Sequence, residues 1–310
     1  MRTWPELPYA QWKDTLQTLH LWTQIVGKYR LAHTPWLNHS WHATFYVSAR
    51  GLTSSTIAAG ERALDVEFDF IDHALVARAS DGARAELALA PISVAEFHAR
   101  FLALLRSLNL DTGFHGVPNE IPDPIPFAED TRHAAYDADA AHRFWQALVR
   151  VERVLKLFRT GFLGKSSPVH LFWGALDLAV TRFSGRPAPE HPGGVPALPD
   201  AIAREAYSHE VSSAGFWPGG GAIDFAAFYA YAYPEPDGFA AAEVAPAEAY
   251  YEPTLGEFLL PYDAVRASPE PEQALLRFLQ SSYAAAADLG GWDRAALDCP
   301  LGEPRVPRPR

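Results

Sequence analysis

The chain has 310 residues, a formal net charge of −11 and a single cysteine, Cys299. One cysteine excludes an intramolecular disulfide and any metal site built from several cysteines, and the negative charge disfavours binding to nucleic-acid phosphates. The first twenty residues include charged side chains, and no apolar run approaches about 18 residues, so we expect neither a signal peptide nor a membrane span. The composition predicts a soluble, cytoplasmic protein that binds neither nucleic acid nor membranes.

Residues 1–112 predict a first α+β unit. Apolar residues recur at helical spacing near its two ends, and β-branched and aromatic residues mark strands between them. Ser93 is expected to cap the second helix, because Glu96 stands at the capping-box position. The predicted elements are a helix over Tyr9–Val26, strands over Trp41–Ser48, Thr53–Ile57, Leu64–Ile71, Ala74–Ala79 and Arg84–Ala90, and a helix over Ser93–Leu108.

Residues 113–137 predict a Pro-rich connector, and residues 138–295 a second α+β unit. Residues 296–310 form a Pro- and Arg-rich tail that we expect to be disordered. The elements predicted for the second unit are a helix over residues 138–162, strands over Val169–Phe183, Tyr207–Phe216, Ile223–Tyr233 and Glu257–Tyr262, and a helix over Glu270–Ala287.

The second unit repeats the plan of the first. The segments Glu86–Leu108 and Glu257–Leu279 align without a gap and are identical at eight positions, and Trp41 and Trp173 each precede an arginine by nine residues. These matches predict an internally duplicated α+β fold. Its two halves, each a helix, an antiparallel sheet and a second helix, would share one core about a pseudo-two-fold axis.

Four long segments resemble a bacterial family known as domain of unknown function 5996. The resemblance extends from Trp4 to about Trp292, nearly the whole chain, and it implies no activity and no catalytic residue. The segments are WPELPYAQWKDTLQTLHLWTQIVGKYRLAHTPWLNHSWHATFYVSARGLTSS, GKSSPVHLFWGALDLAVTRFSGR, REAYSHEVSSAGFWPGG and AYAYPEP.

Histidines suggest one possible metal site. His39 and His42 have the spacing of a ligand pair, but they would face opposite sides of a regular strand, so only a turn or bulge would let them converge. Hydrogen-bonded histidines in a polar loop are the alternative. If a metal is bound, the candidate ligands are His39, His42, His170 and His209.

Asp177 interrupts an apolar run that predicts a strand buried on both faces. Alternation places Trp173 and Asp177 on one face and Arg182 on the other. A buried carboxylate is costly unless it is paired or hydrogen-bonded. The alignment of the two halves sets Phe45 at the corresponding position, so the carboxyl belongs to the second half alone. It is predicted either to form an ion pair with an arginine or to act as an acid or base in a pocket.

The segment after the Pro-rich excursion holds a candidate for proton transfer. His209 is that candidate, because histidine as a residue type can exchange protons near neutral pH, and the adjacent Glu210 would face the other side of the same strand. With Asp177, these two are the candidate catalytic residues, and a core histidine is the alternative for His209. The nearby serines lack a Gly-x-Ser-x-Gly elbow, so the sequence does not support a hydrolase of that type.

Aromatic residues are predicted to wall a small-molecule pocket. Tyr229 and Tyr231 alternate onto one strand face, and Trp173 and Trp217 are expected nearby. His42 is a further candidate for the lining. Sheet packing is the alternative explanation for this aromatic stripe.

Three basic residues are candidates for holding an anionic ligand. Lys165, Arg182 and Arg186 follow the second helix within the strand-rich part of the chain, and arginine side chains suit carboxylate or phosphate groups. The function expected from these patterns is a small-molecule enzyme with its pocket between the two halves. A non-catalytic binding protein and a metal-dependent enzyme are the alternatives. The sequence leaves the cofactor, the substrate and the oligomeric state open.

Overall fold

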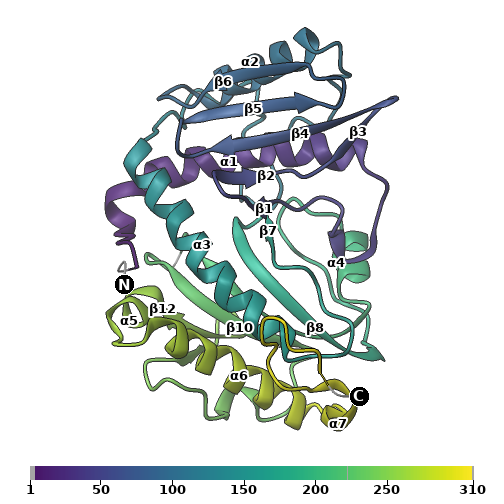
Figure 1. Ribbon diagram of the computed structural model, residues 1–310, viewed down its shortest axis with the longest axis vertical. Coiled ribbons are helices and arrows are strands. Elements are labelled where there is room, and N and C mark those ends of the chain that lie inside the picture. Colours follow the sequence, from purple (N-terminus) through teal and green to yellow (C-terminus); the bar gives the residue numbers. More distant parts are fainter. Residues whose placement is uncertain (1–3, 222, 309–310) are drawn as a thin grey trace.

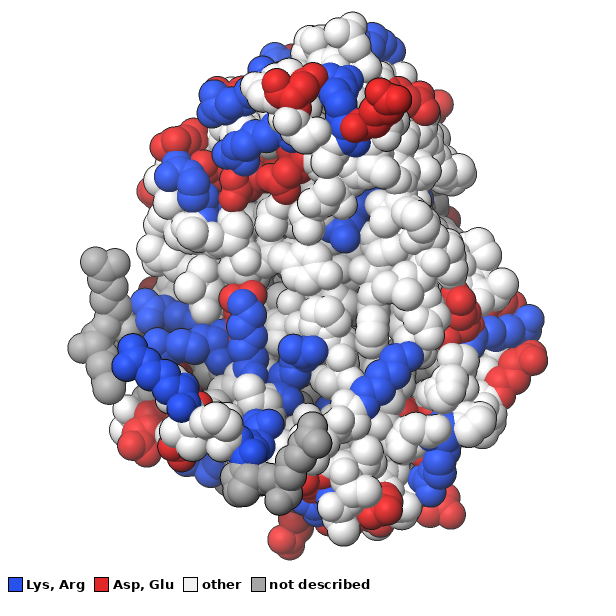
Figure 2. Space-filling model, turned by 45° about the vertical axis from the view of Figure 1, so that its right-hand side comes forward, with Lys and Arg blue, Asp and Glu red and all other residues white. Residues whose placement is uncertain are grey.

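The computed structural model describes residues 4–221 and 223–308. It contains two antiparallel sheets, and the first helix, Tyr9–His33, lies between them (Figure 1). Helices lie against each sheet, so the fold is α+β, as predicted. On the face drawn in Figure 2, charged side chains gather toward the two ends of the molecule and leave a largely uncharged band between them.

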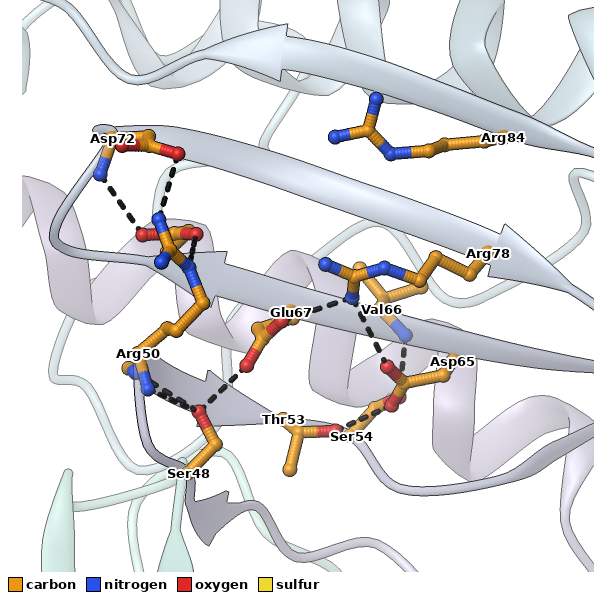
Figure 3. Close-up of polar contacts among 12 residues, drawn as sticks. Ser48, Arg50, Thr53, Ser54, Asp65, Val66, Glu67, Asp72, Arg78 and Arg84 are labelled. Atoms are coloured by element: carbon orange, nitrogen blue, oxygen red, sulfur yellow. Dashed lines mark hydrogen bonds and ion pairs between the residues drawn. The ribbon is translucent and has the colours of Figure 1, made fainter.

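The first half forms a meander with strand order β1-β2-β4-β5-β6, and β3 pairs with β4. Strand β4 alternates as expected: Leu64, Val66 and Phe68 are buried in the core, while Asp65 and Glu67 join the polar contacts of Figure 3. The elements are α1 (Tyr9–His33), η1 (Asn38–Ser40), β1 (Tyr46–Val47), β2 (Gly51–Thr53), β3 (Ile57–Ala59), β4 (Arg62–Asp69), β5 (Ala74–Ala79), β6 (Arg84–Ala88) and α2 (Val94–Ser107).

The second half forms a sheet of order β11-β12-β10-β9-β8-β7. Helix α3 contacts β8, and α6 contacts β9 and β10. Both helices lie in front of this sheet in Figure 1. The elements are α3 (Ala138–Thr160), β7 (His170–Phe172), β8 (Asp177–Pro187), α4 (Asp200–Ala206), β9 (His209–Trp217), β10 (Ala227–Tyr233), η2 (Phe239–Ala241), β11 (Tyr250–Glu252), β12 (Glu257–Pro261), α5 (Tyr262–Ala267), α6 (Pro271–Leu289) and α7 (Arg294–Leu297).

The two sheets meet at β1 and β7. Phe45 and Leu171 exchange backbone hydrogen bonds of 2.9 and 2.8 Å there. Residues 21–30 of α1 are all buried, which is the pattern of a helix enclosed on every side. One hydrophobic cluster contains buried residues of both halves. Several polar residues of α1 are therefore carried into the interior, where they need partners.

The long strand predicted over Val169–Phe183 is wrong. The chain forms a hairpin, with β7 and β8 joined by a turn over residues 173–176 in which Leu176 has a φ of 59°. Gly174 lies in this turn, and a glycine inside a strand pattern often marks such a break. The hairpin moves Asp177 from the middle of a strand to the first position of β8.

The strand predicted over Trp41–Ser48 is also wrong for most of its length. Only Tyr46–Val47 forms a strand, and η1 precedes it with His39 at a φ of 61°. The sequence did not predict α4, β11, α5 or α7. Within the tail that was predicted to be disordered, the chain contacts the end of α3, where Cys299 donates its backbone N–H to the carbonyl of Gly161. Residues 309–310 lie outside the described part of the chain.

Candidate functional site

A cavity of about 480 Å³ lies over the face of the second sheet that α3 and α6 leave free. Asp177 and Thr181 of β8 line it, whereas Arg182, the residue after Thr181, points to the opposite face and donates to the carbonyl of Phe158 in α3. The connector, η1 and α4 close the cavity from the other side. Its aromatic lining includes Trp36, Trp41, Phe172, Trp173, Trp217 and Tyr229.

Asp177 accepts a hydrogen bond from the hydroxyl of Tyr229, which comes from two strands away. The strand between them places Gly215 beside Tyr229 in the register of β9 and β10. A Cβ at Gly215 would lie 2.6 Å from the Tyr229 hydroxyl oxygen. Glycine at this position therefore lets the phenol cross β9 and reach the carboxyl.

The environment of Asp177 suits proton transfer. Burial raises the pKa of this carboxyl to about 6, even though the hydrogen bond from Tyr229 acts in the opposite direction. A group with a pKa near the working pH can both accept and donate a proton. Burial also raises the pKa of Tyr229 well above its ordinary value, with the charge of Asp177 as the next cause. The phenol thus remains a hydrogen-bond donor at neutral pH.

Two more carboxyls line the cavity, Glu120 from the connector and Glu257 from the start of β12. Burial, followed by the negative charge of Asp177, raises the pKa of each to about 7, and the charge of Lys28 opposes this shift at Glu120. In residues 4–221 and 223–308, neither carboxyl has a hydrogen bond that offsets its burial. The cavity therefore holds three acids that share little positive charge.

Helix α1 and a distant loop together position Glu120. Gln24 accepts a 2.8 Å hydrogen bond from the backbone N–H of Asn119 and donates a 2.9 Å bond to its carbonyl. Glu120 donates its own N–H to the carbonyl of Pro196 and has a φ of 59°. Its carboxyl lies against Gly174, where any side chain would collide with it. A left-handed conformation at a non-glycine residue costs of order 1–3 kcal/mol, and such strain clusters at functional sites.

Trp173 is wedged between α1 and η1. Its indole lies against Gly27, which has no side chain to block it, and its Nε1–H donates a 2.7 Å hydrogen bond to the carbonyl of Ala43. The ammonium of Lys28 lies 5.7 Å from the indole centroid and donates to the side-chain carbonyl of Asn119. Burial lowers the pKa of Lys28 to about 8, although a nearby carboxylate opposes the shift.

A second set of polar groups lies at the η1 side. The Lys165 ammonium donates a 2.8 Å hydrogen bond to Nε2 of His39, whose Nδ1 donates a 2.6 Å bond to the carbonyl of Ala206. Burial lowers the pKa of both Lys165 and His39. Further along the wall, the hydroxyls of Tyr207 and Tyr231 are 2.9 Å apart.

The structure brings some of the expected site residues together and separates others. Those lining the cavity are Asp177, Trp173, Trp217, Tyr229, Tyr231 and His39, and Lys165 reaches it through His39. Arg182 lies instead in a buried aromatic cluster, 3.6 Å from the ring centroid of Phe158 and 4.3 Å from that of Tyr283. It has no access to a ligand in the cavity.

Glu210 and Arg186 form an ion pair with each other. Their closest atoms are 2.7 Å apart, and Arg186 also donates to the carbonyls of Gly290 and Gly291 at the end of α6. This arrangement satisfies both charges on the helix-covered side of the sheet. Neither residue is part of the cavity lining.

The remaining histidines also lie outside the lining. His209 contacts the hydroxyl of Ser208 at 3.1 Å, and its ring centroid is 6.4 Å from that of His39. His42 contacts the backbone of Leu37, and Nδ1 of His170 lies 3.3 Å from the hydroxyl oxygen of Thr44. Across residues 4–221 and 223–308, no three His, Cys, Asp or Glu side chains are grouped so that they could hold a metal ion.

Comparison with known proteins gives a family and nothing more specific. A sequence model for a family of unknown function (DUF5996) matches residues 4–299. The chain belongs to the DUF5996 family. No curated protein and no solved structure matches it. In residues 4–221 and 223–308 of this DUF5996 protein, no helix combines the length and the apolar character that crossing a bilayer requires.

Sequence reasoning about this DUF5996 protein missed two cavity acids, Glu120 and Glu257, and the lysine whose charge acts on Glu120, Lys28. Glu120 lies in a Pro-rich segment that the sequence marks only as a connector. Glu257 begins a strand and resembles any polar strand end. A usable signal existed for Lys28, because it lies within an unbroken buried stretch of α1 and needs a polar partner there.

Proposed function

We propose that this protein is a small-molecule enzyme in which Asp177 transfers protons and Tyr229 orients and supports it. The observation that carries the proposal is the buried carboxyl of Asp177, hydrogen-bonded across Gly215 in an aromatic-walled cavity. Concave sites with apolar walls and a few convergent polar groups are the usual small-molecule sites. Carboxyls with shifted pKa values in such sites are candidates for catalysis.

The chemistry that fits this geometry is general acid–base catalysis. With its pKa raised to about 6, Asp177 is mostly ionised at neutral pH and can take a proton from a bound substrate. The Tyr229 hydroxyl can donate a hydrogen bond to the carboxylate or to a developing negative charge beside it. His209, the residue favoured by sequence alone, lies outside the cavity lining, so we assign it no proton-transfer step.

The second candidate is a non-catalytic protein that binds a ligand in the same cavity. The aromatic walls support binding as well as they support catalysis. The metal-dependent alternative receives no support from the described side chains, because they offer no three-ligand cluster.

An Asp177→Asn variant separates an enzyme from a binding protein. The two proteins are purified in parallel, denatured, and their released small molecules compared by mass spectrometry. Our proposal predicts that Asp177→Asn retains a compound that wild-type protein converts when the two are mixed. Glu210→Gln, which removes a carboxyl outside the cavity, is the matched control and should behave as wild type. Return of the compound unchanged by wild-type protein would establish the binding alternative instead.

We also propose a cytoplasmic location and an origin by internal duplication. The single cysteine is consistent with a reducing compartment, and fractionation of cells would test the location. In both sheets, strands that follow one another in the chain lie side by side, in the orders β1-β2-β4-β5-β6 and β7-β8-β9-β10-β12. This shared arrangement supports duplication. An experimental structure in which the two halves fail to superpose would contradict it.

A further inference from the structure

The charge inside the cavity is unbalanced. Three carboxyls line it, from three separate segments of the chain, and no arginine of the described residues does. Lys28 and Lys165 are the lysines closest to the lining, and each already donates to a polar partner, Asn119 and His39. The charged and titratable groups that face the acids are Lys28 and His20 of α1, His39 of η1, Lys165 before β7, and Tyr207, Tyr229 and Tyr231.

The acids are placed for an organic ligand and not for a single ion. Asp177 influences both Glu120 and Glu257 through its charge, so all three act on one region of space. Their oxygens still do not converge as metal ligands do, since the described residues contain no metal-ligand group. Glu120 has a left-handed conformation, its N–H donates to the carbonyl of Pro196, and Gln24 bonds the backbone of the preceding Asn119, so its position in the cavity is built into the fold.

The walls between the acids are aromatic. Trp173, Trp217 and Tyr229 come from a turn and two strands and line the same space as the carboxyls. Aromatic faces attract organic cations, and more strongly where the cation is desolvated. Carboxylates next to such faces repel anions, so this lining selects for positive charge on an organic frame.

We propose that the ligand of this cavity is a small organic amine, bound as its ammonium ion by the carboxyls of Glu120 and Glu257. The inference rests on the proposed small-molecule function and replaces the anionic ligand expected from the sequence. The hydrocarbon part of the ligand packs on Trp173 and Trp217, and Asp177 lies beside the ammonium group. Arg182 and Arg186, the expected anion-binding residues, are occupied elsewhere.

Three probes of the same size and different charge test this inference: benzylamine, benzyl alcohol and benzoate. Isothermal titration calorimetry with the wild-type protein at about pH 8 should show benzylamine binding at least about tenfold more tightly than benzyl alcohol, and benzoate binding most weakly. Equal binding of all three, preference for benzoate, or no binding of benzylamine would each overturn the proposal. This comparison does not require a variant to fold.

Variants then locate the ammonium group. Glu120→Gln and Glu257→Gln should each weaken benzylamine binding at least about fivefold and leave benzyl alcohol unchanged. Glu210→Gln is the control. Full benzylamine affinity in both variants would overturn the assignment. Different results would contradict the two proposals. The order of the probe affinities tests the amine proposal. The catalytic proposal is contradicted if Asp177→Asn converts the retained compound as wild type does.

Discussion

The outer face of the first sheet and the cavity over the second both carry acids, but they differ in how the best-buried acids are partnered. On the first sheet, Asp69 pairs with Arg50. Glu67 accepts hydrogen bonds from Ser48 and Arg78 (Figure 3). On the second sheet and its cover, Glu120 and Glu257 have no such partners within the described chain. Carboxyl side chains are therefore partnered on one side of the molecule and left without partners on the other.

The pKa values express this difference. Burial acts to raise the pKa of Asp69, but hydrogen bonds from Arg50 and the backbone amides of Asp72 and Ile71 outweigh it and keep the pKa below its usual value. Burial without such partners raises the pKa of Glu257 to about 7. Compensated acids stabilise a fold, whereas uncompensated acids cost stability, which makes Glu120 and Glu257 candidates for a functional role.

The largest expected effect is on activity. Asp177→Asn should lower turnover of the retained compound by about 100-fold or more, because it removes the group that takes the proton. Asp69→Asn, the matched change on the first sheet, should leave turnover within about twofold of wild type. Single-turnover assays measure both. Equal losses in the two variants would mean that Asp177 acts through the fold and not through chemistry.

The next effect concerns the glycine that lets Tyr229 reach Asp177. Gly215→Ala should lower the free energy of unfolding by about 1–3 kcal/mol, since the new Cβ meets the Tyr229 hydroxyl and the carbonyl of Leu178. Gly116→Ala is the control, because nothing lies within 4 Å of a Cβ there. Chemical denaturation measures the difference. A fully stable Gly215→Ala protein would show that the phenol does not cross β9 as described.

Neutralising acids on the two sheets should change stability in opposite directions. Asp69→Asn should cost about 1–2 kcal/mol, because Arg50 loses a charged partner. At about pH 8, Glu257→Gln should be neutral or stabilising by up to about 1 kcal/mol, since it removes a buried charge without a partner. Urea denaturation tests both. Destabilisation by Glu257→Gln as large as that of Asp69→Asn would erase the distinction between the two faces.

The dependence of stability on pH should follow from the cavity acids. Glu120 and Glu257 have pKa values raised from 4.5 to about 7, so the folded protein binds more protons than the unfolded chain between these values. The free energy of unfolding should therefore fall as pH rises from about 4.5 to about 7 and level off above that. The double variant Glu120→Gln/Glu257→Gln should flatten this slope, and Asp69→Asn should not. Thermal melts across this pH range measure the slope. An unchanged slope in the double variant would contradict the prediction.

The sequence predicted helices better than it predicted turns that depend on tertiary packing. The helix capped by Ser93 is confirmed, with its hydroxyl accepting from the Glu96 N–H at 3.1 Å, because capping depends on neighbours in the chain. The hairpin before Asp177 and the turn at His39 were missed, because tertiary packing overrides the strand preference of the aromatic residues there.

Site prediction succeeded where strand alternation decides the outcome and failed where distant segments meet. Tyr229 and Tyr231 point into the cavity because they alternate on one strand. Glu120 gains its environment from Gln24 and Pro196, which lie far from it in the sequence. No local pattern encodes that meeting, so a Pro-rich segment concealed a cavity acid.

The most direct test of the uncompensated cavity is a pH titration of the protein followed by NMR of carbon-13-labelled side-chain carboxyls, with the signals assigned from Glu120→Gln, Glu257→Gln and Asp69→Asn. We predict that Glu120 and Glu257 titrate near pH 7, that Asp69 titrates below its ordinary pKa of 3.8, and that benzylamine moves the two glutamates toward lower pH. Titration of both glutamates near their ordinary pKa of 4.5, with no response to benzylamine, would contradict the account.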